Sequence, residues 1–318
     1  MLSDCVETEV DVTRVAIVGA GAMGSVFGAA LGQAEADVVL VDVDAAHVAA
    51  INRDGLTVEG ADGTTRQATR LRAVTDPAGE SAVDLLFVFV KGVHTDAAMA
   101  ASAPLIGPST VVVSLQNGWG NGDVVARHVD PSRIVVGTTL VSAGALGPGR
   151  VAETASGVTK LGPFVGDDLA GAERTAQVLR AAGLDVEVST DVRRDIWSKL
   201  VLNAAANPTG ALTGLHASAL VEHAPMWQLV QALAREAVVV ARAEGYDLDA
   251  DEMIASIREV LVNAGPSRAS MLQDFDAGRA SEIDVITGAV VRAAARHGID
   301  VPHNATILAL VQGAERAR

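Results

Sequence analysis

The chain has 318 residues, 49% of them hydrophobic and 20% charged, a composition typical of a globular protein of about two domains. Its net charge of −15 argues against nucleic acids and anionic membranes as partners, because both are bound by basic surfaces. A single cysteine, Cys5, excludes an internal disulfide and a cysteine-based metal site, so we expect no metal and a reducing, cytoplasmic location. Residues 1–12 are acidic, lack the positive start of a signal peptide, and are predicted to form a flexible tail.

Residues 13–190 alternate short β-branched runs with helical patterns, which is typical of parallel βαβ units. Strands are predicted at 14–18, 37–42, 84–90, 110–115 and 134–140, with helices ending near residues 33 and 52. Antiparallel strands within 149–162, a helix at 169–182 and a strand at 186–189 follow. We therefore predict an α/β fold whose N-terminal domain is a doubly wound sheet of the Rossmann type. The uncharged run at 15–32 is long enough to span a membrane, but it reads as a strand followed by a glycine-rich turn.

Residues 191–318 carry helix-period apolar positions almost throughout, which predicts an all-helical domain that holds substrate and catalytic groups. Helices are expected at 191–207, 225–244, 250–263 and 281–297. Pro208 is expected to end or kink the first helix, and Ser281 to cap the last one, which stops at Gly298. Because no linker separates the domains, we expect them to pack tightly around a ligand cleft.

A glycine motif follows the first predicted strand and begins the first helix: Gly19-Ala20-Gly21-Ala22-Met23-Gly24. The first glycine permits the turn, the second lets a pyrophosphate approach the backbone, and the third packs helix against strand. Asp42 ends the second strand, where a carboxylate binds the ribose hydroxyls of NAD and repels the 2′-phosphate of NADP. The motif therefore predicts a dinucleotide site, and Asp42 favours NAD(H). The alternative is that Asp42 or Asp44 caps the next helix.

Only three of the 24 basic residues are lysines: Lys91, Lys160 and Lys199. Lysine can be tuned to release its proton and arginine cannot, so Lys199, in an apolar helix, is the candidate proton donor. Lys199, Asn203 and Asn207 recur every four residues and share one helix face. Buried polar groups need partners, either a ligand or hydrogen bonds to a neighbouring helix. For Lys160 we favour the alternative that the lysine is retained by chance and has no chemical role.

These segments resemble the ketopantoate reductase (2-dehydropantoate 2-reductase) family over nearly the whole chain. The motifs that carry the resemblance are GAGAMG, VKGVHT, LQNG, GTTLVSA, WSKLVLNAAANP and SMLQD followed by SEID. The resemblance implies a Rossmann domain and a helical domain with catalysis between them. It also implies reduction of the C2 ketone of ketopantoate to (R)-pantoate by NADPH, a step toward pantothenate and coenzyme A.

The resemblance also implies a role for each matching residue. Lys199 corresponds to the general acid that protonates the C2 oxygen, and Glu282 to a cofactor contact that orients Lys199. Asn117 corresponds to a residue that touches both cofactor and substrate. Further cofactor contacts are implied at Lys91 and Ala143, and further substrate contacts at Asn203, Asn207 and Ser270.

The chain departs from the family pattern at three positions. Asp42 stands where an NADPH enzyme is expected to be basic or neutral, and Ala217 and Ser267 stand where asparagines are common. The alternative function is therefore an NAD-dependent D-2-hydroxyacid dehydrogenase acting on another 2-oxo acid. A catalytically silent dinucleotide sensor is a third hypothesis, disfavoured by the intact lysine–asparagine face. The sequence leaves the oligomeric state open, including a homodimer through the helices of residues 225–263.

Overall fold

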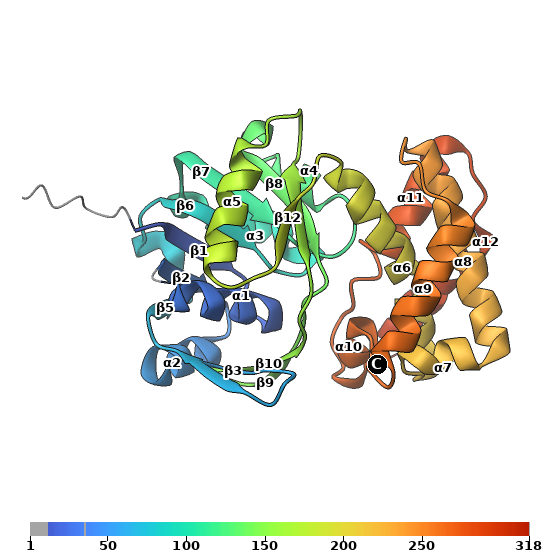
Figure 1. The fold of residues 1–318 in the computed structure, drawn as a ribbon, viewed down its shortest axis with the longest axis horizontal. Helices are drawn as coiled ribbons and strands as arrows, with labels where there is room; N and C mark the ends of the chain where they lie inside the picture. Colours follow the sequence, from blue (N-terminus) through green and yellow to red (C-terminus); the bar gives the residue numbers. More distant parts are fainter. Residues whose placement is uncertain (1–11, 35, 318) are drawn as a thin grey trace, which may run out of the picture.

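The computed structural model describes residues 12–34 and 36–317. A sheet-containing part and a helical part lie side by side, with the long helix α6 (Val192–Thr213) at the boundary between them (Figure 1). The tail predicted for residues 1–12 lies outside the described residues except for Val12, which is exposed.

The main sheet has eight strands in the order β12-β11-β8-β7-β6-β1-β2-β5. Six of them are parallel, namely β5 (Leu71–Val74), β2 (Asp37–Val41), β1 (Arg14–Val18), β6 (Val83–Val88), β7 (Ile106–Ser114) and β8 (Ile134–Thr139). The edge strand β11 (Thr159–Pro163) is antiparallel to β8, and β12 (Val186–Val188) is parallel to β11. The order of the parallel strands is that of a doubly wound dinucleotide-binding sheet, so the predicted fold class is confirmed.

Helices cover both faces of the main sheet because its strands are apolar on both sides. Val15 and Ile17 of β1 pack in one core with Phe27, whereas Ala16 and Val18 pack in the other with Met99. The helices of this part are α1 (Ala22–Gln33), α2 (Ala45–Asp54), α3 (Thr95–Ala101), α4 (Asn121–Val125) and α5 (Ala170–Ala181). Short 3-10 turns occur at Pro77–Gly79, Gly92–His94, Ala103–Leu105 and Pro131–Arg133.

A second sheet of four short strands packs beside α1 in the order β4-β3-β10-β9. Its strands are β3 (Leu56–Glu59), β4 (Thr65–Ala68), β9 (Ser142–Gly147) and β10 (Arg150–Ala155). The antiparallel strands predicted within residues 149–162 correspond to β10, which pairs with β9, and to β11, which pairs with β8, whereas β9 itself was not predicted. The β3–β4 hairpin and β5 are not predicted by the sequence pattern, because strands of four residues with polar members carry almost no periodicity.

The helical part packs around α6, whose buried residues join those of α8 and α11 in one core. Its other helices are α7 (Ala217–Glu222), α8 (Ala224–Ala243), α9 (Ala250–Ala264), α10 (Ser270–Asp276), α11 (Thr287–His297) and α12 (Pro302–Arg316). The predicted helices at 225–244 and 250–263 are confirmed within one residue at each end. The sequence pattern predicts none of α7, α10 and α12.

Of the two outcomes predicted for Pro208, an end of the helix is wrong, and the helix cap predicted at Ser281 is also wrong. Pro208 does not end α6, which continues to Thr213, and the Thr209 hydroxyl donates to the Ala205 and Ala206 carbonyls at 3.1 and 2.7 Å. A proline inside a helix is tolerated where tertiary packing holds both sides, and Pro208 is buried. Ser281 does not cap a helix, because α11 begins only at Thr287.

No helix in residues 12–34 or 36–317 is long and apolar enough to cross a membrane. The uncharged run at 15–32 forms β1 and most of α1, with the glycine-rich turn between them.

Candidate active site

The glycine turn between β1 and α1 leaves the start of the helix open. Gly19 has φ +93°, and a Cβ there would lie 2.6 Å from the Val90 nitrogen. A Cβ on Gly24 would lie 2.0 Å from the Gly19 oxygen, so both positions require glycine for packing. Gly21, in contrast, is the exposed N-cap of α1 and faces no atom within 4 Å. Open space at a helix N-terminus fits a pyrophosphate, which the free N–H groups would bind.

The two acidic residues after β2 have different roles. Asp44 caps α2, because its carboxylate accepts the N–H groups of Ala46 and His47 at 2.9 and 3.1 Å. Among residues 12–34 and 36–317, the Asp42 carboxylate accepts one hydrogen bond, from the N–H of Asp44 at 2.9 Å, and Asp42 is partly exposed. Asp44 is therefore the cap of α2, and Asp42 is not.

A chain of three side chains connects the two parts of the molecule. Lys199 of α6 donates from Nζ to Asn117 Oδ1 at 3.0 Å and to the Thr139 carbonyl oxygen at 2.6 Å. Asn117 follows β7 and donates from Nδ2 to Glu282 Oε2 at 3.2 Å. The three residues are 82 and 165 positions apart along the chain, so only the packed fold brings them together.

Burial favours the neutral form of both ionisable residues in this series of hydrogen bonds, Lys199 and Glu282. Desolvation lowers the pKa of Lys199 from its usual value to about 8, and the negative charge of Glu282 opposes that shift. Desolvation likewise raises the pKa of Glu282, against the hydrogen bond from Asn117 and the charge of Lys91. A lysine that exchanges its proton near pH 8 suits a general acid or base.

Lys91 is held where β6 ends and the helical part begins. Its Nζ pairs with Asp274 Oδ2 of α10 at 2.8 Å and also donates to the Ala280 carbonyl oxygen. Asp274 in turn accepts from Arg279 Nε at 3.0 Å. This ion pair ties the end of a sheet strand to the segment that carries Glu282.

The segment around Glu282 fits closely against the strand ends. The N–H of Trp119 donates to the Val285 carbonyl oxygen at 2.9 Å, and a Cβ on Gly118 would lie 2.3 Å from that oxygen. Residues 281–286 lie outside α11 and contact both parts of the molecule: Val285 accepts from Trp119, whereas the Ser281 N–H donates to Glu315 Oε1 of α12 at 2.7 Å. The Ser281 hydroxyl accepts the N–H of Ile283 at 3.2 Å, a local turn in place of the predicted helix cap.

The remaining predicted site residues lie around this centre. Asn203 is buried and Asn207 partly buried on α6, and neither amide makes a hydrogen bond to any residue that the structure describes. That finding counts against the alternative of a hydrogen-bond network between helices. Ser270 is the exposed first residue of α10, a helix that packs on α6. Ala143 of β9 packs with Met23 of α1 against one core of the sheet part.

Family models extend across both parts of the chain. The model described as ketopantoate reductase PanE/ApbA matches residues 15–166, and the C-terminal model of the same family matches residues 191–315. The chain belongs to the ketopantoate reductase family. It is accordingly an NAD(P)-dependent oxidoreductase, and the resemblance predicted from the motifs is confirmed.

Relatives and solved structures cover nearly the whole chain. The 2-dehydropantoate 2-reductases of Halobacterium salinarum and Archaeoglobus fulgidus are each 34% identical, over 95% and 96% of this chain and 99% and 98% of theirs. A D-mandelate dehydrogenase solved with NADH and anilino(oxo)acetate is 31% identical with a TM-score of 0.91, covering 96% of this chain and 99% of its own. A ketopantoate reductase family protein of Ralstonia eutropha JMP134 is 33% identical with a TM-score of 0.87, at the same coverages.

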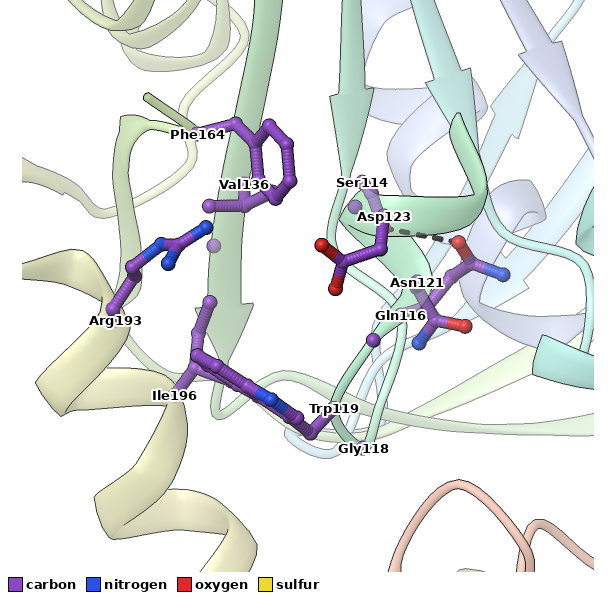
Figure 2. A pocket seen from close by; sticks show the side chains of 13 residues that line it. Ser114, Gln116, Gly118, Trp119, Asn121, Asp123, Val136, Phe164, Arg193 and Ile196 are labelled. Atoms are coloured by element: carbon purple, nitrogen blue, oxygen red, sulfur yellow. Dashed lines mark hydrogen bonds between the residues drawn. The ribbon is translucent and has the colours of Figure 1, made fainter. Parts of the chain in front are cut away.

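An aromatic cluster at the boundary positions α6 in this family member. The guanidinium of Arg193 lies over the rings of Phe164 and Trp119, 5.0 and 5.8 Å from their centroids. Figure 2 shows this arginine pointing into a pocket with Asp123 on the opposite side. The rings of Trp119 and Trp197 of α6 also contact each other in a tilted arrangement, with their centroids 5.4 Å apart. The first turn of α6, and through it Lys199, is thereby fixed against the sheet part.

Sequence reasoning missed several residues that build this site. Thr139 contacts Lys199 through its backbone carbonyl oxygen. Every residue type has such an oxygen, so the sequence does not reveal this role, although Thr139 belongs to the motif GTTLVSA. Asp274 lies within SMLQD, and its spacing to Lys91 of 183 positions hides the pairing. Asn121 donates from Nδ2 to the Asn117 carbonyl oxygen at 2.9 Å. In the sequence, only its position shortly after the strand that precedes Asn117 suggested a place near the site.

Proposed function

We propose that the chain is a 2-dehydropantoate 2-reductase, which reduces the C2 ketone of ketopantoate to (R)-pantoate. The observation that carries the proposal is the hydrogen-bonded chain from Lys199 through Asn117 to Glu282, with the pKa of Lys199 at about 8. A ketone reduction needs one hydride on carbon and one proton on oxygen, and this lysine can supply the proton.

In the proposed reaction, the hydride at C2 would come from a reduced nicotinamide cofactor held by residues 19–24 and the neighbouring strand ends. Lys199 donates its proton to the C2 oxygen, which becomes the alcohol, and the neutral amine regains a proton from solvent. Asn117 orients the ammonium through its Oδ1, and Glu282 holds Asn117 from the other side. Asn203, Asn207 and Ser270 bind the substrate. Their free polar groups support that role for the two asparagines.

The cofactor is proposed to lie across the ends of the parallel strands. Residues 19–24 would bind its pyrophosphate, with Ala20, Ala22 and Met23 forming the turn and the first turn of α1 between the glycines. Lys91, Asn117, Ala143 and Glu282 would contact its nicotinamide half. We propose that residues 13–190 bind the dinucleotide and that residues 191–318 supply the substrate and catalytic groups.

We propose a preference for NADH over NADPH. Asp42 lies at the end of β2 with a carboxylate that does not cap α2, so it can bind ribose hydroxyls and repel a 2′-phosphate. Arg53, the cation that a phosphate would need, is paired with Asp54 at 2.6 Å.

A second candidate is an NAD-dependent dehydrogenase for another 2-oxo acid. Ala217 and Ser267, which replace the asparagines expected from the family pattern, are adjacent, with the Ala217 N–H donating to the Ser267 carbonyl oxygen at 3.0 Å. Loss of two amides at one place favours a less polar substrate. A D-mandelate dehydrogenase solved with NADH is among the similar structures and supports this candidate.

The test is the initial rate of ketopantoate reduction by the purified protein, measured in parallel with NADH and NADPH. Rapid turnover is expected, faster with NADH. Absence of turnover on ketopantoate together with turnover on phenylglyoxylate would establish the second candidate. No turnover with any 2-oxo acid, with dinucleotide still bound, would indicate a sensor. Cytoplasmic location and a homodimer stay predictions, the latter open to sedimentation analysis.

A further inference from the structure

Ser25 of α1 holds the glycine turn through a hydrogen bond that helical serines do not usually make. Inside a helix, a serine or threonine hydroxyl commonly donates to the carbonyl oxygen four residues earlier, as Thr175 does to Gly171 at 2.8 Å. The Ser25 hydroxyl instead donates to the Ala20 carbonyl oxygen at 2.7 Å, five residues back and before the first residue of α1. The Ser25 N–H also donates to the Gly21 carbonyl oxygen at 2.8 Å. Ser25 therefore fixes two consecutive peptide groups of the turn.

The Ser25 hydroxyl is itself held by a buried histidine of α2. His47 Nε2 lies 3.3 Å from Ser25 Oγ, and His47 Nδ1 accepts the N–H of Gly149, in the turn between β9 and β10, at 3.0 Å. Because Nδ1 accepts, the proton of the ring lies on Nε2 and is donated to Ser25 Oγ, whose own proton goes to Ala20. Ser25 and Ala20 are fully buried and His47 is 8% exposed, so water does not compete for these bonds.

The same histidine is connected to the acidic residue proposed to bind ribose. The backbone N–H of His47 donates to Asp44 Oδ1 at 3.1 Å, and the N–H of Asp44 donates to Asp42 Oδ1 at 2.9 Å. His47 thus lies between the turn that would bind the pyrophosphate and the carboxylate that would bind the ribose. A dinucleotide spans both positions, so its affinity depends on how firmly the protein holds each of them before it binds.

We propose that His47 and Ser25 are positioning residues for the dinucleotide, which hold the Ala20 peptide group in the orientation that leaves the glycine turn open to a pyrophosphate. The proposal rests on the proposed function, because it takes residues 19–24 as the pyrophosphate site. Both side chains are buried and act through the Ala20 peptide group, without contact to the cofactor. Without their hydrogen bonds this peptide group can rotate, and the apparent Kd rises by the inverse of the fraction of molecules that keep the open turn.

The first test compares Ser25→Ala with Thr175→Ala, which removes a buried hydroxyl from α5 and leaves the glycine turn unchanged. Binding of NADH to the protein without substrate is followed by fluorescence titration, and kcat and the KM for NADH are measured with ketopantoate. Ser25→Ala is expected to raise the Kd and KM for NADH about fivefold, the ratio that corresponds to one hydrogen bond, with kcat at saturation unchanged. Thr175→Ala should keep the wild-type Kd. Equal Kd values in the two variants would overturn the proposal.

The second test separates the two ring nitrogens of His47. His47→Gln can place an amide N–H where Nε2 donates to Ser25, whereas His47→Asn is one methylene shorter and reaches only the position of Nδ1. His47→Gln should therefore bind NADH more tightly than His47→Asn. Because Ser25 and His47 act as one unit, the double variant Ser25→Ala/His47→Asn should bind no more weakly than Ser25→Ala. Wild-type NADH binding by His47→Asn would overturn the proposal, whatever its melting temperature.

The NADH titration also distinguishes failure of this proposal from failure of the proposed function. If wild type binds NADH and reduces ketopantoate while Ser25→Ala binds NADH equally well, only the positioning role fails. If Ser25→Ala weakens NADH binding but wild type does not reduce ketopantoate, the positioning role stands and the proposed substrate fails. If wild type binds no NADH, the proposed dinucleotide site fails and the positioning role with it.

Discussion

Lys199 is a lysine whose environment favours release of its proton. Its ammonium is held by the Asn117 and Thr139 oxygens while burial lowers its pKa to about 8. An arginine at this position would keep the charge and lose the proton transfer, because its pKa lies far above neutrality. The same reasoning explains why a chain that uses arginine almost everywhere has a lysine here.

Lys199→Arg is expected to lower kcat for ketone reduction by about 10²–10⁴-fold, the usual contribution of a positioned general acid. Dinucleotide binding, followed by fluorescence quenching, should persist because the glycine turn is untouched. A variant that keeps near wild-type kcat would show that Lys199 is not the proton donor.

The pH profile tests the electrostatic coupling between Lys199 and Glu282. Below its pKa of about 8 Lys199 carries the proton to be donated and above it does not, so kcat/KM for reduction should fall as pH rises through 8. Glu282→Gln keeps an oxygen for Asn117 but removes the negative charge that raises the pKa of Lys199. The falling limb should therefore move to lower pH, and an unmoved limb would contradict the coupling.

Asp42→Ala is expected to raise kcat/KM for NADPH relative to NADH, because the carboxylate that repels a 2′-phosphate is gone. The matched control is Asp44→Ala, which removes the α2 cap at a cost of about 0.5–2 kcal/mol of stability. That control should leave the cofactor ratio unchanged. Equal ratios in Asp42→Ala and wild type would leave Asp42 without a ribose role.

At the scale of elements, the glycines at the start of α1 have different surroundings. Gly24 lies where the helix meets the turn, and a Cβ would lie 2.0 Å from the Gly19 oxygen. Gly21 lies at the N-cap and faces empty space. Two glycines three positions apart thus differ: Gly24 is required for packing, whereas packing leaves room for a side chain at Gly21, the position proposed to approach the cofactor.

The matched pair Gly24→Ala and Gly21→Ala tests that difference. Gly24→Ala should destabilise the protein by about 1–3 kcal/mol, the usual cost of overpacking, and lower its melting temperature. Gly21→Ala should melt at the wild-type temperature but bind NADH more weakly, because the methyl group occupies the approach of the pyrophosphate. Unchanged NADH affinity in Gly21→Ala would place the dinucleotide elsewhere.

At the scale of the whole molecule, the candidate site exists only where the two parts meet. Asn117 and Lys91 come from strand ends of the sheet part, and Lys199 and Glu282 from the helical part. The cluster of Trp119 with Arg193 and Trp197 sets the distance between them. In the proposed mechanism, small movements at this boundary would displace Lys199 from the substrate carbonyl.

Trp119→Ala should therefore lower kcat by up to about 10²-fold, which a misplacement of about 1 Å can cause. Trp227→Ala is the control, since Trp227 also packs on the helical core but belongs to α8, away from the sheet part (Figure 1). Both variants should melt at lower temperature than wild type. Equal losses of kcat would mean that the boundary cluster contributes stability alone.

Much of the fold could be predicted because its signals are local. The run at 84–90 is apolar on both faces, as a central parallel strand must be, and β6 lies there. GAGAMG predicts a turn into a helix, and α1 begins inside it. The segments that failed are those decided by distant contacts: residues 281–286 dock on the strand ends, and Pro208 stays helical within a packed core.

The sequence by itself determined the fold class, the glycine turn, the helix face of Lys199 and Asn203, and the family. Those features rest on spacing within about 30 residues, where backbone geometry relates sequence to space directly. Only the tertiary structure decided which acidic residue caps α2 and that Lys199 is linked through Asn117 to Glu282. Contacts between residues 82 or 165 positions apart, and the desolvation they cause, depend on how whole elements pack.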